Sequence, residues 1–88
     1  MATYHVNGIV EYTSVYTKTP NGRYEKKVVH AFERDISGAE TPQEAFEMTE
    51  QALIKKYTRR PSFVNEHKDI HITYCKVYEL KEVFEMEE

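Results

Sequence analysis

The sequence predicts a small α+β protein with element order β-β-α-β: a long N-terminal hairpin, one helix, and a third strand completing a three-stranded sheet with the helix packed on one face. Residues 3–18 and 23–37 alternate polar and apolar side chains, which is typical of strands. Residues 42–60 place apolar side chains at helical spacing, and residues 69–83 alternate again. With 88 residues, the chain forms one domain, residues 1–88, with a modest core.

The two N-terminal stretches are expected to pair around the segment TPNGR, residues 19–23. A two-residue Asn21-Gly22 loop would pair even with odd positions and mix core residues with charges on one face. A three-residue loop instead pairs Thr19 with Arg23, and places Pro, Asn and Gly where a bulged type I turn needs them. This register pairs Val6 with Ile36, Val10 with Phe32, Tyr12 with His30 and Ser14 with Val28, and puts Gly8 opposite Arg34.

The segment Thr41-Pro42-Gln43-Glu44 predicts a helix start, because Thr41 can cap, Pro42 suits the first turn and Glu44 completes a capping box. The helix is expected to end near Arg60, before Pro61. Its predicted inward stripe is Ala45, Phe46, Met48, Thr49, Ala52, Leu53 and Tyr57. Its basic end complements the helix dipole and also forms a secondary basic patch of Lys55, Lys56, Arg59 and Arg60.

The third strand is expected over residues 69–83, with its two faces separated by simple alternation. Ile70, Ile72, Tyr74, Tyr78 and Leu80 would face the helix, and His71, Cys75 and Val77 would lie on the other face. The right-handed crossover rule places this strand beside the first one and parallel to the second, in the order 2-1-3. An edge position beyond the second strand is the alternative.

The far end of the hairpin is expected to project beyond the helix, since the helix spans ~27 Å and an unbroken strand of this length ~50 Å. This projecting arm is a candidate interaction surface rich in basic and aromatic residues: Tyr16, Lys18, Arg23, Tyr24, Lys26 and Lys27. The same composition also suits a nucleic-acid-binding surface. A structural alternative is that the lysines protect an edge and the tyrosines add pairing energy.

The odd-numbered face of the sheet is a second candidate surface, because it is more apolar than a solvated face requires. We expect it to contact a second copy or a partner protein through Ile9, Val15, Val29, Ala31, Cys75 and Val77. The alternative is a wet sheet face with scattered Val and Thr.

Catalytic, metal and cofactor motifs do not emerge from the sequence. His71 and Cys75 would lie ~13 Å apart on a strand, too far to share a metal ion. His30 is expected to be hydrogen-bonded and half-buried beside Tyr12. There is no glycine-rich phosphate loop, and no nucleophile, base and orienting group converge. We therefore expect no enzyme activity, no cofactor and no metal.

Composition favours a cytoplasmic protein. A single cysteine excludes an internal disulfide framework, and neither a signal peptide nor an apolar membrane span is apparent. The net charge of −3 argues against nucleic-acid binding by the whole surface. The acidic tail, residues 84–88, is expected to fray.

These observations predict a non-enzymatic protein–protein interaction module that acts through its overhanging hairpin and open sheet face, as a homodimer or with a protein partner. An accessory or regulatory protein of a phage or mobile element would fit this size. The alternative is a nucleic-acid-binding module that uses the basic hairpin tip and the end of the helix.

Overall fold

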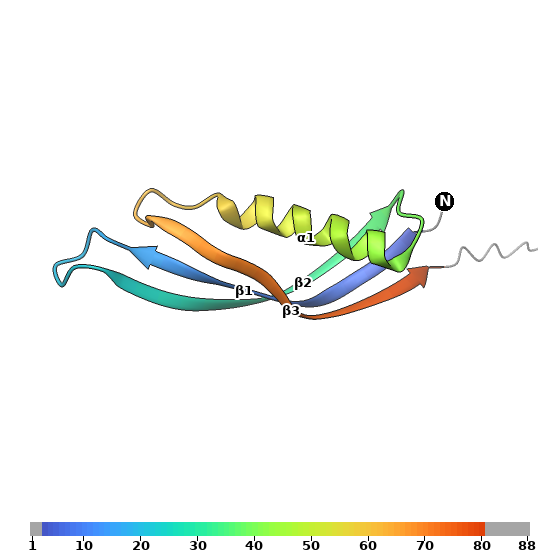
Figure 1. The fold of residues 1–88 in the computed structure, drawn as a ribbon, viewed down its shortest axis with the longest axis horizontal. Coiled ribbons are helices and arrows are strands. Elements are labelled where there is room, and N and C mark those ends of the chain that lie inside the picture. The colour runs from blue at the N-terminus through green and yellow to red at the C-terminus, as the bar shows by residue number, and fades with distance from the viewer. Residues whose placement is uncertain (1–2, 81–88) are drawn as a thin grey trace, which may run out of the picture.

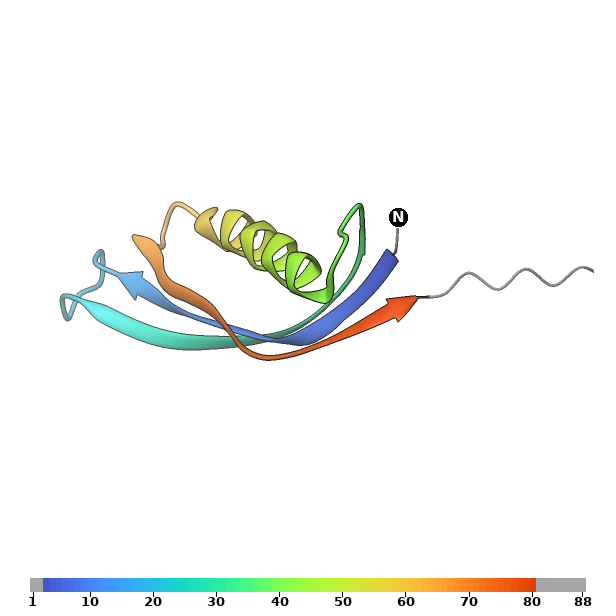
Figure 2. The ribbon, with the colours of Figure 1, turned by 45° about the vertical axis from the view of Figure 1, so that its right-hand side comes forward.

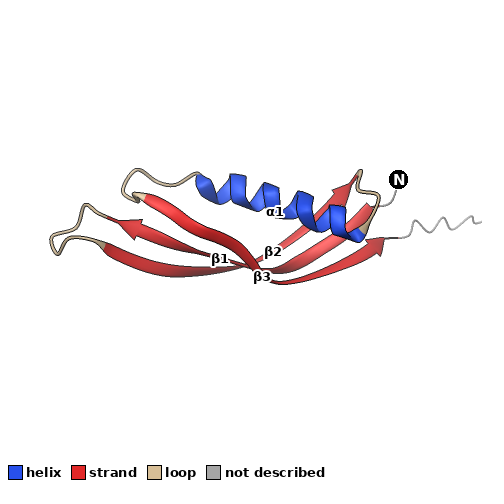
Figure 3. Ribbon diagram, in the orientation of Figure 1, coloured by secondary structure: helices blue, strands red, loops and turns tan. Residues whose placement is uncertain are grey.

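The computed structural model describes residues 3–80, and shows one antiparallel three-stranded sheet with a helix on one face (Figures 1 and 3). The elements are β1 (Thr3–Tyr16), β2 (Tyr24–Ser37), α1 (Pro42–Thr58) and β3 (Glu66–Leu80). The strand order is β2-β1-β3, with β1 antiparallel to both neighbours. The α+β prediction and the strand order expected from the crossover rule are confirmed, whereas the acidic tail lies outside the described residues.

The hairpin has the predicted turn chemistry but a different register. The Gly22 N–H donates to the Thr19 carbonyl at 3.1 Å, and Gly22 adopts a left-handed φ of +87°. However, the ladder ends at the pair Tyr16–Tyr24, so that residues 17–23 form a longer loop. Even positions still meet even positions, but each pair is shifted by two residues. Val10 lies opposite His30, and the predicted pairing with Phe32 is wrong.

Cross-strand contacts explain the observed register. It places Phe32 opposite Gly8. It also lets the His5 imidazole meet the Asp35 carboxylate at 2.7 Å. The rings of Tyr16 and Tyr24 face each other with centroids 5.6 Å apart. Such pairs contribute a few tenths to about 1 kcal/mol each, and alternation alone does not distinguish registers that differ by two.

The helix begins as predicted and ends two residues early. Thr41 Oγ1 accepts from the Glu44 N–H at 3.1 Å, while the Glu44 carboxylate accepts from the Glu40 N–H at 3.0 Å. The last helical residue is Thr58, after which Arg59 is extended. The residues buried on the helix are Ala45, Thr49 and Leu53. Met48, predicted on the inward stripe, is 43% exposed and points away from the core.

β3 contradicts the simple alternation predicted for it, because it contains two register shifts against β1. One lies between the pairs Ile9–Tyr74 and Val10–Ile72, and the other lies between Glu11–His71 and Thr13–Lys68. Asp69, at the second shift, has a left-handed φ of +56°. An extra residue in one strand moves the side chains beyond it to the opposite face. The three segments of β3 that these shifts separate therefore do not follow one even–odd rule.

Gly8 marks the place where β3 approaches β1 most closely. A Cβ atom on Gly8 would lie 2.0 Å from the Tyr74 carbonyl oxygen, so no other residue fits without moving the β3 backbone. The site adjoins the first register shift of β3. In Figures 1 and 2 the sheet curves around α1, and bulges of this kind bend and twist strands.

The core lies between the concave face of the sheet and α1. Its buried residues are Tyr4, Val6, Val10, Phe32, Ile36, Ala39, Ala45 and Leu53, with Ile70, Ile72, Cys75 and Val77 packed against them. The helix packs chiefly over β3 and less over β2. Among residues 3–80, no helix combines the length and apolar character needed to cross a membrane.

Candidate interaction surfaces

The hairpin tip projects less than predicted. β3 pairs with β1 as far as Val15, and the Asn65 N–H donates to the Val15 carbonyl at 2.7 Å, so the expected two-stranded arm is flanked on one side. Only the loop of residues 17–23 and the adjoining ends of β1 and β2 extend past this point (Figure 1).

The basic residues of the hairpin tip do not converge on one surface. Arg23 and Lys68 both contact Glu25, at 3.2 and 2.7 Å, and Lys27 contacts Glu11 at 3.1 Å. Lys27 lies on the open face, whereas Lys26 alternates onto the helix side. Arg23 and Lys27 are thus engaged in ion pairs, and Lys26 lies on the opposite face of the sheet from Lys27.

Phe63, in the loop after α1, is an aromatic residue at the tip that the sequence analysis missed. Its ring is 66% exposed and stacks on Tyr16 with centroids 6.5 Å apart and planes 14° apart. A pocket of about 180 Å³ beside it is lined by Lys18 and Arg60 among others. The available signal was a phenylalanine in the predicted loop of residues 61–68.

The secondary basic patch is also divided. Lys56 Nζ lies 5.3 Å from the centre of the Tyr57 ring, on the side of α1 that faces β2. Arg60 donates from Nε to the Asn65 carbonyl and lines the tip pocket instead. Lys55 and Arg59 are exposed. The four residues therefore serve at least two surfaces rather than one continuous phosphate-binding track.

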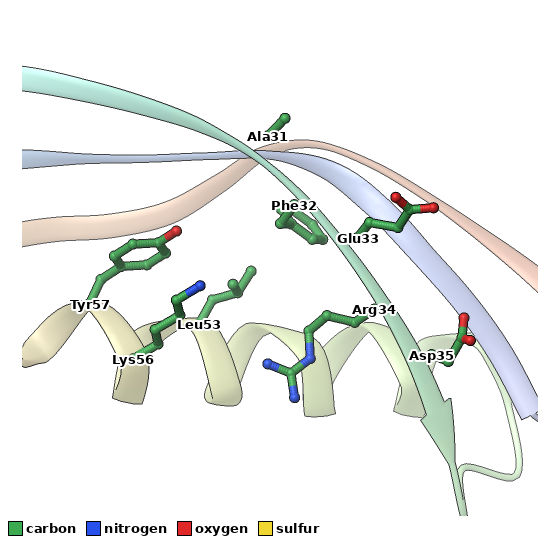
Figure 4. A pocket seen from close by; sticks show the side chains of 8 residues that line it. All are labelled: Ala31, Phe32, Glu33, Arg34, Asp35, Leu53, Lys56 and Tyr57. Carbon is green, nitrogen blue, oxygen red and sulfur yellow. The ribbon is translucent and has the colours of Figure 1, made fainter.

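A groove of about 510 Å³ runs between α1 and β2 (Figure 4). Phe32 and Leu53 point into it, and Arg34 and Lys56 approach it from opposite sides, while Glu33 and Asp35 point to the other side of β2. Within residues 3–80, neither Arg34 nor Lys56 forms an ion pair. The groove exists because α1 lies closer to β3 than to β2.

An aromatic cluster of Tyr12, His30, Tyr57 and His67 closes the core beneath the end of α1. The Tyr12 hydroxyl and His30 Nε2 are hydrogen-bonded at 3.0 Å, as expected for a half-buried histidine. The His30 and Tyr57 rings stack with centroids 5.2 Å apart. Burial raises the pKa of Tyr12, and no carboxylate joins the cluster among its hydrogen bonds. The cluster packs aromatic rings around the hydrogen bond between Tyr12 and His30.

The described part of the chain contains no group of three His, Cys, Asp or Glu residues placed to hold a metal ion. Cys75 is half-buried, and burial raises the pKa of its thiol, which disfavours the reactive thiolate.

The structure places only three of the six residues predicted for the dimer or partner face on the open face of the sheet. Ile9, Val29 and Ala31 lie on the open face of the sheet and are exposed. Val15 is fully buried, and the ion pair between Glu25 and Lys68 reaches across β1 near it. Cys75 and Val77 pack on the helix side, because the register shifts in β3 reverse its faces.

The same reversal brings Tyr74, Tyr78 and Leu80 to the open face, where the sequence analysis did not place them. Ala31, Ile9 and Tyr74 are cross-strand neighbours and form an apolar row that crosses all three strands. Ion pairs surround this row: Glu11 contacts Lys27 and His71, and His5 contacts Glu33 and Asp35. The result is an apolar centre with a charged rim.

The arrangement defines a small, open-faced α+β domain whose distinctive parts are exposed strand surfaces. Comparisons of the chain with protein-family models, with curated proteins and with solved structures find no match.

Proposed function

We propose that this protein is a non-enzymatic interaction module, of the accessory or regulatory type, that binds a partner protein through the open face of its sheet. The observation that carries this proposal is the apolar row Ala31–Ile9–Tyr74. Ile9 is 37% exposed and Tyr74 48% exposed, and Val29, 55% exposed, adjoins the row on β2. Isolated exposed apolar residues are ordinary, whereas a contiguous set is typical of a binding surface.

The surroundings of the row support the same proposal. Protein interfaces commonly have an apolar centre surrounded by polar and charged side chains, with aromatic residues enriched. Here Tyr74 and Tyr78 provide the aromatic surface, and Lys76 Nζ lies 6.0 Å from the centre of the Tyr74 ring. A partner with a complementary apolar strip would exclude water from the row while its own charges met the rim.

The test is partner capture from the native host with matched variants. Ile9→Lys places a charge at the centre of the row, and Met48→Lys makes a similar change on the outward side of α1. A protein that is retained by the wild type and by Met48→Lys, but lost with Ile9→Lys, supports the proposal. Circular dichroism must show that both variants are folded. Undiminished retention by Ile9→Lys would count against the open face.

The second candidate function is single-stranded nucleic-acid binding at the hairpin tip. The stack of Phe63 on Tyr16, beside Lys18 and Arg60, favours it. Bases stack on exposed aromatic rings, with contributions of about 1–3 kcal/mol per base. Fluorescence anisotropy with a labelled oligonucleotide should then show binding that weakens as salt rises and that is reduced by Phe63→Ala. Binding that is absent, or unaffected by salt, rejects this candidate.

A further inference from the structure

We infer that β2 is a self-association edge, at which two copies of this chain pair their β2 strands antiparallel, with Ala31 on the two-fold axis, to form one six-stranded sheet. This goes beyond the proposed function, since it uses the backbone of β2 rather than the open face. The occupant is a second copy of the same chain.

The backbone of β2 is the first observation. β2 is an edge strand, and all its residues from Tyr24 to Ser37 pair with β1 in a single register without a shift. Within residues 3–80, no hydrogen bond from another element reaches its outer backbone groups. In Figure 4 β2 crosses in front of β1 and β3. A long regular edge of this kind is a template for another strand.

The symmetry of the pairing limits the registers. A two-fold axis normal to the sheet keeps each face on its own side, so a residue can only pair with one of the same parity. The two-fold axis therefore passes through a residue pair, such as Val29, His30, Ala31 or Phe32 with its own copy.

The charges that oppose each other between the two copies then distinguish these four registers. An axis at His30 would oppose Lys26 with the partner's Arg34, and Glu25 with the partner's Asp35. An axis at Val29 would oppose Glu25 with the partner's Glu33. Like charges that face each other across strands are destabilising. An axis at Phe32 avoids such pairs, but it forms no opposite-charge pair.

An axis at Ala31 forms opposite-charge pairs, and it sets Val29 opposite the partner's Glu33. Lys27 lies opposite the partner's Asp35, twice by symmetry, and His30 lies opposite the partner's Phe32 on the helix side. No like charges face each other. The apolar row Tyr74–Ile9–Ala31 also continues across the axis into the partner's Ala31, Ile9 and Tyr74, which doubles the open-face surface in one line. Ala31 is small enough to meet its own copy without a clash.

Cysteine cross-linking in a Cys75→Ala background tests this register. Directly opposed residues in antiparallel strands have Cα atoms about 4.5–5.5 Å apart, which lies within the range for a disulfide. Ala31→Cys should therefore give covalent dimers under mild oxidation, at least tenfold more than Val29→Cys. Val29 is the matched control, because it lies on the same face of the same strand but about 13 Å from its own copy. Combining Val29→Cys with Glu33→Cys should restore cross-linking.

A charge exchange provides an independent measurement. Lys27→Glu should weaken the dimer about tenfold in sedimentation equilibrium, because it opposes two acids at each end of the interface. Adding Asp35→Lys should restore most of the lost affinity. A wild type that sediments as a monomer at hundreds of micromolar overturns the inference. So does a dimer in which Val29→Cys cross-links as well as Ala31→Cys. Cross-linking and sedimentation measure the β2 dimer, whereas partner capture with Ile9→Lys measures binding by the open face. Either proposal can therefore be rejected while the other stands.

Discussion

The two edges of the sheet differ in a way that the order β2-β1-β3 does not require. β2 runs in one unbroken register along β1, whereas β3 changes register twice over a similar length. At the second change Asp69 takes a left-handed φ of +56°. Bulges interrupt the regular row of donors and acceptors that another strand would need. The same sheet thus has one edge interrupted by bulges and one edge with a single continuous register.

The helix accentuates this difference. α1 packs chiefly against β3, where Cys75 and Val77 line its side of the sheet, and leaves the groove beside Arg34 and Phe32 open. On the open edge, protection against indiscriminate pairing comes instead from charges. Charged residues lie near both ends of β2, so two of the four registers compared above, with the axis at Val29 or His30, oppose like charges. One edge is thus interrupted by two register shifts, and the other combines a continuous register with charged side chains.

The largest loss of stability is expected from a substitution at Gly8, where β3 approaches β1 most closely. Gly8→Ala would place a Cβ against the Tyr74 carbonyl oxygen, and the β3 backbone can only yield by losing its pairing. We expect a loss of about 3 kcal/mol in the free energy of unfolding, measured by urea denaturation. Gly22→Ala is the control, because it has left-handed backbone strain but open space around it, and should lose about 1 kcal/mol. Equal losses would show that close approach is unimportant at Gly8.

A substitution at Asp69, in the second bulge of β3, should reduce stability less than Gly8→Ala. A β-branched residue is disfavoured at a φ of +56°, so Asp69→Val is expected to lose about 1–2 kcal/mol of unfolding free energy. Asp69→Gly should be at least as stable as the wild type, since glycine adopts this conformation freely. Thermal denaturation of the two variants gives the comparison. If Val and Gly are equally tolerated, the bulge does not restrain β3 as described.

Amide hydrogen exchange can compare the two edges directly. In the β2 dimer, alternate β2 amides should exchange about tenfold more slowly as protein concentration rises through the dimerisation range. The β3 amides should show no such dependence, since that edge stays unpaired. Exchange measured by NMR at two concentrations tests this, and concentration dependence at β3 instead of β2 would reverse the assignment of the edges.

The smallest loss of stability is expected from a substitution at Glu25. This residue of β2 forms ion pairs with Lys68 on β3 and with Arg23. Hydrogen bonds from the Lys68 and Arg23 side chains hold the pKa of Glu25 below its ordinary value of 4.5. A lowered carboxyl pKa stabilises the fold above the ordinary value, and this contribution disappears as the pH falls through the folded-state pKa. Glu25→Gln should therefore be slightly less stable than the wild type at neutral pH. The gap should close in denaturation series below pH 4.5, and a gap that widens in acid would contradict this account.

The correct predictions from sequence share a physical basis. Thr41, Pro42 and Glu44 act within one turn of chain, and so does the Thr19–Gly22 turn. The parity of β1 and β2 follows from alternation over many residues, which is why Ile9, Val29 and Ala31 were correctly placed on the open face. The misplaced residues, Val15, Cys75 and Val77, depend on β3 and on the loop before it. Tyr74, Tyr78 and Phe63 were missed for the same reason.

The sequence by itself determined the element order, the helix start, the turn and the faces of the first two strands, because each follows from local chemistry or from a period of two. The hairpin register, the two bulges and the reversal of β3 were decided only in the tertiary structure. A shift of two residues leaves the apolar pattern unchanged, so the choice fell to contacts between distant residues, such as His5 with Asp35 and Tyr16 with Tyr24. The bulges are defined by how β3 pairs with β1, and no stretch of β3 alone contains that constraint.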